Sequence, residues 1–273
     1  MCYQYGKAIT ETVLESGKTF KREDMKTAFY VMISDSHYYP EGCHIMVNSF
    51  KHFHPDIDLV VFRQDMIDKV FKETGCNWLT AKPVFAKLLY DKYDKVVNID
   101  ADTVVTGRLE EVLKDNYDIG AAWNFNDYEN AMFDDITEEM YLQAGMVAST
   151  KKEFWDTWDK ANKDAMKYPR KENDILNLVV YHQLPKLKLK IFDKRRDYYG
   201  CKSLGREPEF YIEDDKLMCR KQQVLAYHFA RGGVFPKLDF PNMPLKDEVK
   251  AWLMKTAYYG VSINVKGYET IFN

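Results

Sequence analysis

The sequence lacks several features that define a functional class at once. It has no apolar run long enough to cross a bilayer or to act as a secretory signal, so we expect no transmembrane segment and a cytoplasmic location. Its five cysteines form no Cys-x-x-Cys pair, which argues against a disulfide framework or a zinc knuckle. The formal net charge of −3 leaves no overall basic field, so no nucleic-acid partner is expected.

Internal repeats and low-complexity linkers are also missing, and 273 residues with 46% hydrophobic content can bury a sizeable core. We expect a polar N-terminal extension over residues 1–25. The main domain is expected over residues 26–240, and a C-terminal helix and tail over residues 241–273 that packs on it. The oligomeric state is left open.

Hydrophobic periodicity predicts strands that alternate with helices. This alternation predicts an α/β fold with a mixed, mainly parallel central sheet flanked by helices. The expected strands are 27–34, 57–62, 96–99, 118–125, 141–149, 187–192 (at an edge) and 222–229, and the expected helices are 43–53, 66–73, 79–90, 151–166, 172–181 and 249–259.

The most informative stretch is Lys95–Thr106, KVVNIDADTVVT, in which an apolar strand runs into Asp100 and Asp102. In an extended backbone, residues two apart share one face, with Cα atoms roughly 6.5 Å apart. Two carboxylates on one face repel each other unless a cation lies between them or one is protonated. At the carboxyl end of a strand this pattern indicates a metal and phosphate site.

Three chemistries compete for this aspartate pair. An EF-hand fails, because Val104 and Val105 stand where an oxygen ligand and a glycine are needed. A haloacid-dehalogenase-like, Mg²⁺-dependent phosphatase would use Asp100 as its nucleophile, although its motif normally opens the domain. A sugar-nucleotide transferase would use the pair to hold a divalent cation against a diphosphate.

The block YDKVVNIDADTVVTGRLEEVL resembles the signature of GT-A glycosyltransferases of family 8, the glycogenin and lipopolysaccharide-galactosyltransferase group. Further blocks follow in the family's order: VMISDSHYYPEGCHIMVNSF, YLQAGMVAST, ENDILNLVV and AYHFARGG. The resemblance implies that residues 26–240 form a GT-A catalytic domain, with a Rossmann-like nucleotide-binding half and an acceptor-binding half. The sequence differs from the family's pattern at Gln143, Glu172 and Asn173, where the family usually has Asn, Asp and Gln, respectively.

The resemblance also implies a ligand set. Asp100, Asp102 and His228 would hold Mn²⁺ or Mg²⁺. The donor, a UDP-sugar, would also contact Ala101 and Asp35, the latter through its base or ribose. Further donor-binding candidates are the basic or phosphate-approaching residues Lys82, Lys87, Arg231, Gly232 and Lys237.

Around the transferred sugar, Gln143, Asn173 and Asp174 are the catalytic candidates that the resemblance supplies. The implied reaction moves a hexose from the nucleotide sugar to a hydroxyl of a carbohydrate or glycoconjugate acceptor, with retention. No clear carboxylate nucleophile other than Asp174 is present, so we expect positioning and electrostatics to carry the rate. The phosphatase, and a transferase-like binding module without activity, remain the alternatives.

Overall fold

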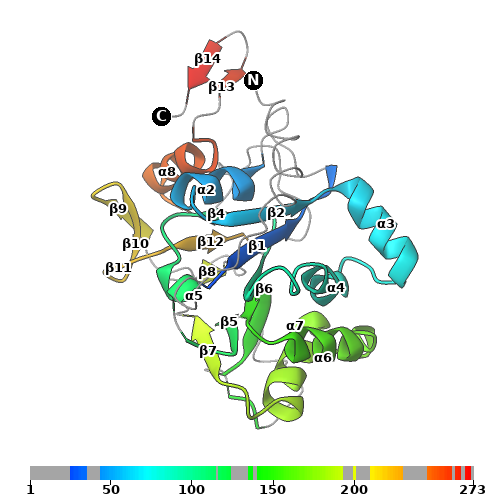
Figure 1. Cartoon of the computed structure of the whole chain (residues 1–273). Coiled ribbons are helices and arrows are strands. Elements are labelled where there is room, and N and C mark those ends of the chain that lie inside the picture. Colours follow the sequence, from blue (N-terminus) through cyan, green and yellow to red (C-terminus); the bar gives the residue numbers. More distant parts are fainter. Residues whose placement is uncertain are drawn as a thin grey trace.

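The computed structural model describes residues 25–35, 44–114, 116–123, 135–137, 140–192, 199–200, 210–229, 245–259, 262–265 and 268–271. A six-stranded sheet forms its centre (Figure 1). From edge to edge its strands are β2 (Asp58–Phe62), β1 (Thr27–Met32), β3 (Lys95–Ile99), β6 (Leu142–Ser149), β5 (Ile119–Trp123) and β7 (Leu189–Phe192).

Five of the six strands run in one direction. β2, β1 and β3 pair in parallel, and so do β5 and β7, whereas β6 is antiparallel to both of its neighbours, β3 and β5. The mainly parallel α/β sheet that the sequence predicts is therefore confirmed, as is the edge position of β7. β1 and β3 are parallel neighbours, so their carboxyl ends lie side by side at the same end of the sheet. The residues that follow these two strands are therefore close together.

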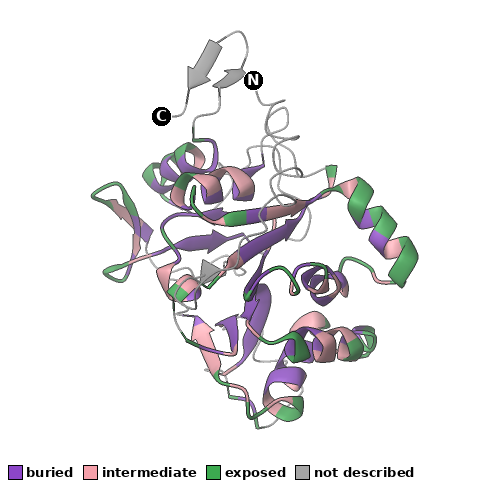
Figure 2. Cartoon of the chain, in the orientation of Figure 1, coloured by how far each residue is buried: buried purple, intermediate pink, exposed green. Residues whose placement is uncertain are grey.

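Alternate residues of β1 build the two halves of the core. Tyr30 and its even-numbered neighbours contact a cluster that includes helices α3 (Gln64–Thr74), α4 (Ala81–Lys87), α6 (Lys152–Asn162) and α7 (Glu172–Asn177). Phe29 and Val31 contact the other cluster, with α2 (Ile45–Phe53) and α5 (Glu110–Lys114). Both sets are fully buried because the sheet is covered on both faces, as Figure 2 shows.

A smaller three-stranded sheet lies beside the central one and contains β4 (Thr103–Val105), β12 (Ala226–His228) and β8 (Tyr199–Gly200). A third sheet is formed by β9 (Phe210–Glu213), β10 (Lys216–Cys219) and β11 (Gln222–Gln223). Helix α8 (Asp247–Ala257) packs against these strands, and Trp252 Nε1 donates to Asp215 at 2.9 Å. The remaining strands, β13 (Ser262–Val265) and β14 (Tyr268–Ile271), pair with each other.

Several predicted elements have different limits in the structure. The expected strand 222–229 is divided between β11 and β12, which belong to different sheets. The expected helix 172–181 is α7 followed by a π-helical segment, Leu178–Gln183, and the helix 151–166 is α6 followed by a 3₁₀ turn, Ala165–Lys167. Within 79–90 only Ala81–Lys87 is α-helical. The hairpin β9–β10 and helix α5 were not among the expected elements.

Among the described residues, no helix combines the length and the apolar character that crossing a bilayer requires.

His54 ties the end of α2 to the segment before α5. It is fully buried, and its Nε2 accepts a hydrogen bond from the Leu109 backbone N–H at 3.2 Å. Burial and then the nearby Arg108 charge lower the pKa of His54 to about 4. The native state therefore keeps this imidazole neutral at pH values where the unfolded chain already binds a proton.

This difference predicts an acid-sensitive stability. Above pH 6.5 the contribution of His54 is fully present, and it is lost as the pH falls from 6.5 to about 4, by up to about 3 kcal/mol. Urea unfolding at a series of pH values measures the slope. His54→Gln, which keeps an acceptor but does not titrate, is expected to flatten it, whereas His182→Gln at an exposed position keeps it. An unchanged slope in His54→Gln would contradict the assignment.

Candidate metal and donor site

Asp100 and Asp102 lie in a turn between β3 and β4 and not in an extended strand. The prediction that the two aspartates lie together because they share one face of an extended strand is therefore wrong. The turn is fixed by backbone hydrogen bonds: Asp100 N–H donates to the Gly145 carbonyl at 2.8 Å, and Phe229 N–H donates to the Asp102 carbonyl at 3.0 Å. These bonds anchor the turn to β6 and to the end of β12.

His228 reaches the same turn from a distant part of the chain. It ends β12, which pairs antiparallel with β4 so that His228 stands opposite Thr103. Its Nε2 lies 2.9 Å from Asp102 Oδ1 and 3.7 Å from Asp100 Oδ2. Ligand atoms of all three side chains lie within 4.8 Å of one another. The structure thus brings together the three residues that the sequence singled out as metal ligands.

The pKa values of His228 and Asp102 depend on each other. Burial on its own would lower the pKa of His228, but the Asp102 and Asp100 carboxylates outweigh burial and raise it. Burial opposes the ionised form of Asp102, yet the charge and hydrogen bond of His228 lower the pKa of Asp102 to about 2. The imidazole and the two carboxylates thus each favour the charged form of the other.

Lys82 brings an ammonium group to this site, and only 6% of its side chain is exposed. It comes from α4, and its Nζ contacts Asp100 Oδ1 at 2.9 Å and Glu172 Oε1 at 3.1 Å. The same ammonium donates to the Ala144 carbonyl at 2.9 Å, which uses all three of its N–H groups. Burial opposes the charge, but the two carboxylates outweigh it and raise the Lys82 pKa above its ordinary value.

An irregularity in β6 supplies the backbone groups of the site. The β5–β6 register shifts between Ala121 and Ala122, so that Ala121 pairs with Val147 and Ala122 with Gln143. The three β6 residues between these partners lie outside the β5 ladder. Their backbone groups serve the site instead: Ala144 accepts from Lys82 and Asn98, and Gly145 accepts from Asp100. Such irregularities are common next to functional sites.

Helix α7 is fixed to this part of β6 by amide side chains. Asn177 forms a two-way pair with the Leu142 backbone, at 2.9 and 3.0 Å. Asn173 Oδ1 accepts from the Ala144 N–H at 3.0 Å. Asp174 is fully buried, and its two oxygens accept from the Tyr141 hydroxyl at 2.7 Å and the Arg170 N–H at 2.9 Å. These contacts place Glu172, at the start of α7, beside Lys82.

Two buried acceptors at the site have no hydrogen-bond partner among the described residues, Gln143 Oε1 and Glu172 Oε2. Burial raises the pKa of Glu172 and the Asp100 charge adds to this, against the opposing charge of Lys82. The sequence pattern did not single out Glu172 as a site residue. The available signal was its place in the block ENDILN, one residue before Asn173.

The other candidates are distributed unevenly. Asp35 is exposed and follows β1 at the same end of the sheet where Asp100 follows β3. Ala101 lies in the turn between Asp100 and Asp102. Lys87 is not brought to the site: its Nζ contacts Asp159 at 2.9 Å and Asp156 at 3.6 Å on α6. Arg231, Gly232 and Lys237 lie outside the described residues.

Lys82 and Lys87 form a matched pair for testing this geometry. Lys82→Met leaves Asp100 and Glu172 without their shared cation, so we expect a loss of unfolding free energy of about 3 kcal/mol. Lys87→Met removes a half-exposed surface pair and is expected to cost about 1 kcal/mol or less. Urea unfolding at pH 7 compares the two.

A third variant separates charge from packing. Adding Glu172→Gln to Lys82→Met removes one of the two uncompensated carboxylates and is expected to restore part of the lost stability. Equal costs for the two lysine variants, or no rescue by Glu172→Gln, would contradict the buried network.

Comparisons with known proteins show the fold. No family model and no curated protein matches the sequence. The structure is similar to that of WbbM, a bifunctional glycosyltransferase, with a TM-score of 0.54 and 15% identity over 88% of this chain and 51% of that one. It is similar to the glycosyltransferase GlyE of Streptococcus pneumoniae, with a TM-score of 0.50 and 13% identity over 85% and 60%. An active-site mutant of LgtC gives a TM-score of 0.50 and 13% identity over 84% and 95%. This chain spans about half the length of WbbM. These likenesses confirm the GT-A glycosyltransferase fold.

Proposed function

We propose that the protein is a metal-dependent glycosyltransferase of the family 8 type. It moves a hexose from a UDP-linked sugar to a hydroxyl of a carbohydrate or glycoconjugate acceptor, with retention. The observation that carries the proposal is the cluster of Asp100, Asp102 and His228 at the carboxyl end of β3, on a chain with a glycosyltransferase fold. Proteins with open α/β sheets commonly bind their ligands at the carboxyl ends of the strands.

The donor set of this cluster suits a divalent cation. It offers carboxylate oxygens and one imidazole nitrogen within 4.8 Å of one another. Hard oxygen ligands suit Mg²⁺ and Mn²⁺, and the imidazole favours Mn²⁺. When bound, the ion supplies Lewis-acid stabilisation of the charge that develops on the leaving diphosphate.

The remaining residues of the site would orient the donor. Lys82 holds Asp100 in one rotamer, which prepares the metal ligand before any donor arrives. Asp35 is proposed to bind the base or ribose, because it follows β1 at the same edge. The unpartnered Gln143 Oε1 and Glu172 Oε2 are acceptors that sugar hydroxyls would satisfy. Asn173 would set this face of the sugar site through its bond to Ala144.

Retention is proposed to occur without a covalent intermediate on Asp174. This carboxylate is fully buried, and both of its oxygens already accept hydrogen bonds from Tyr141 and Arg170. Its role in the proposal is to hold α7 against β6, so that Glu172 and Asn173 stay beside Asp100. Positioning and electrostatics then carry the rate.

Some parts of the proposal rest on the sequence resemblance alone. Arg231, Gly232 and Lys237 are proposed to contact the diphosphate, on the segment that follows His228. The family 8 assignment and the UDP moiety are proposals of the same kind. The cytoplasmic location is proposed from the cysteine pattern and the lack of long apolar runs in the sequence.

A donor screen tests the reaction. With Mn²⁺ and a panel of nucleotide sugars, we expect UDP release from at least one UDP-hexose, and thermal stabilisation by UDP that depends on Mn²⁺. Stabilisation without UDP release from any donor would identify a binding module. Phosphate release from simple esters with Mg²⁺, and no stabilisation by any nucleotide diphosphate, would identify the phosphatase and contradict the proposal.

Asp102→Asn tests the metal assignment. The amide keeps the shape and an acceptor for His228, but it removes the negative charge that the cation needs. We expect the fold to persist and Mn²⁺-dependent UDP binding to be lost, with turnover reduced at least about 100-fold. Asp65→Asn, on the exposed face of α3, is the control and should leave both unchanged. Normal turnover in Asp102→Asn would show that the metal assignment is wrong.

A further inference from the structure

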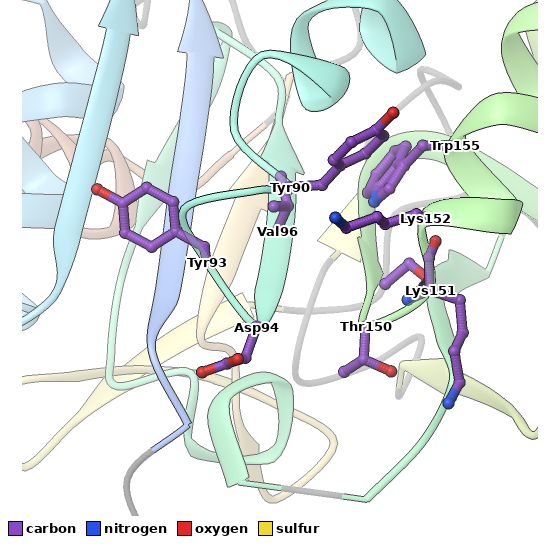
Figure 3. A pocket seen from close by; sticks show the side chains of 9 residues that line it. Tyr90, Tyr93, Asp94, Val96, Thr150, Lys151, Lys152 and Trp155 are labelled. Atoms are coloured by element: carbon purple, nitrogen blue, oxygen red, sulfur yellow. Dashed lines mark hydrogen bonds between the residues drawn. The ribbon is translucent and has the colours of Figure 1, made fainter. Parts of the chain in front are cut away.

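A pocket lies where β3 begins and β6 ends, at the end of these central strands away from Asp100 (Figure 3). Val96 and Ser149, which pair in the β3–β6 ladder, belong to its wall. Asp100 lies four residues further along the chain from Val96, which corresponds to roughly 13 Å of extended strand. The pocket is therefore separate from the metal and donor site, and the proposed reaction does not use it. The other residues that line it are Tyr90, Tyr93, Asp94, Thr150, Lys151, Lys152 and Trp155.

The pocket contains hydrogen-bond donors that lack acceptors. Trp155 is 1% exposed, and its indole Nε1 has no hydrogen-bond partner among the described residues. Figure 3 shows the nitrogen-bearing edge of this ring turned toward the Lys152 side chain, which extends past it toward Tyr90. A buried N–H without an acceptor is destabilising, so an oxygen supplied by a ligand would be favourable there.

The wall beside Trp155 is the start of helix α6. This 11-residue helix begins at Lys152, and within the described chain no side chain caps its first N–H groups. Lys151, at the position before it, belongs to the pocket wall as well. In this first turn the Phe154 N–H donates to the Lys151 carbonyl at 3.2 Å, and the Lys151 N–H donates to Ser149 Oγ at 2.9 Å. The start of the helix thus lies in the wall beside the indole donor, and both favour acceptor oxygens.

Charge argues for a neutral ligand. Each lysine of the wall is already paired, Lys151 with Asp118 at 3.1 Å and Lys152 with Asp91. On the other side, Asp94 accepts from the Lys26 N–H at 2.9 Å, and the Lys26 ammonium lies 4.7 Å from the centre of the Tyr93 ring. Counted with these partners, three side chains are positive (Lys26, Lys151 and Lys152) and three are negative (Asp91, Asp94 and Asp118), so the pairing leaves neither an anion nor a cation favoured.

A polyhydroxylated ring meets both conditions. Each of its hydroxyls can accept from an N–H or an ammonium and donate to a carboxylate, so it satisfies the free donors without adding charge. The rings of Tyr90 and Tyr93 supply the apolar part of the wall. We propose that this pocket is an accessory carbohydrate-binding site that holds one neutral monosaccharide unit, with Trp155 Nε1 and Lys152 as its donors.

The Lys152 side chain controls access to the indole in this proposal. It is 57% exposed and pairs with an exposed carboxylate, a pairing that solvent screens and that is easily broken. Its ammonium also lies 5.0 Å from the centre of the Tyr90 ring. A sugar that displaces this side chain from Tyr90 would reach the indole N–H, and the ammonium would then contact a hydroxyl at the rim.

Nuclear magnetic resonance of the tryptophan indole N–H groups tests the site on the full chain. The chain has five tryptophans, so five indole signals are expected, and Trp155→Phe identifies the one from Trp155. D-glucose, D-galactose and N-acetylglucosamine are titrated separately, with inorganic phosphate as the charged comparison. We expect one of the sugars to shift the Trp155 signal saturably, and phosphate to leave it unchanged.

Lys152→Ala should weaken that response at least tenfold, while Lys163→Ala, at the other end of α6, should not alter it. Calorimetric titration of the wild type and Lys152→Ala gives the same comparison if Trp155→Phe does not fold. The response should persist in Asp102→Asn, which separates this site from the donor site. No saturable shift with any of the three sugars, a shift that Lys152→Ala leaves intact, or a response to phosphate alone would overturn the proposal.

Discussion

The buried ammonium of Lys82 is the interaction on which the arrangement of the site depends. It contacts Asp100 in the turn after β3, Glu172 from α7 and the Ala144 carbonyl from β6, so one cation joins three parts of the chain that are far apart in the sequence. With 6% of its side chain exposed, it is poorly solvated, and the two carboxylates compensate for that loss. Without this charge, Asp100, Asp102 and Glu172 would place three negative charges around a single buried space.

The backbone of β6 makes this junction possible. Where its register with β5 shifts, the backbone groups of Ala144 and Gly145 bond to α4, α7, the Asp100 turn and the Asn98 side chain, and not to the backbone of β5. The side chains of Asn173 and Asn177 then bind α7 to the same stretch. Gln143 and Glu172, whose oxygens are proposed to accept hydrogen bonds from the sugar, are positioned by these contacts. The proposed metal-binding and sugar-binding parts of the site therefore share the same backbone support.

The sequence predicted the parts of this structure that are governed by strong periodicity. β1, β3 and β6 are mainly apolar because both faces of the sheet are covered, and α6 shows a regular apolar face. The hairpin β9–β10 was missed because its turn residues, Asp214 and Asp215, adopt positive φ angles without a glycine to signal them. The division of 222–229 between two sheets follows from tertiary pairing of β12 with β4, which no local pattern encodes.

At the site, the sequence identified Asp100, Asp102 and His228, although their proximity arises from a turn and a pairing between β12 and β4. Lys82 and Lys87 could not be separated by composition, yet they are five positions apart on one helix and so point about 140° away from each other. Only Lys82 faces the aspartates, while Lys87 contacts α6. The neighbours Ala81, Phe85 and Ala86 are buried like Lys82, a local apolar context that in retrospect distinguishes the two.

Diffraction from crystals grown with Mn²⁺ and UDP tests the central claim most directly, because the anomalous signal of manganese locates the ion without reference to activity. We expect one strong anomalous peak bound by Asp100, Asp102 and His228, with the UDP diphosphate completing its coordination and Lys82 still in contact with Asp100. A peak bound by other residues, or UDP bound at this edge of the sheet with no ion between the two aspartates, would contradict it.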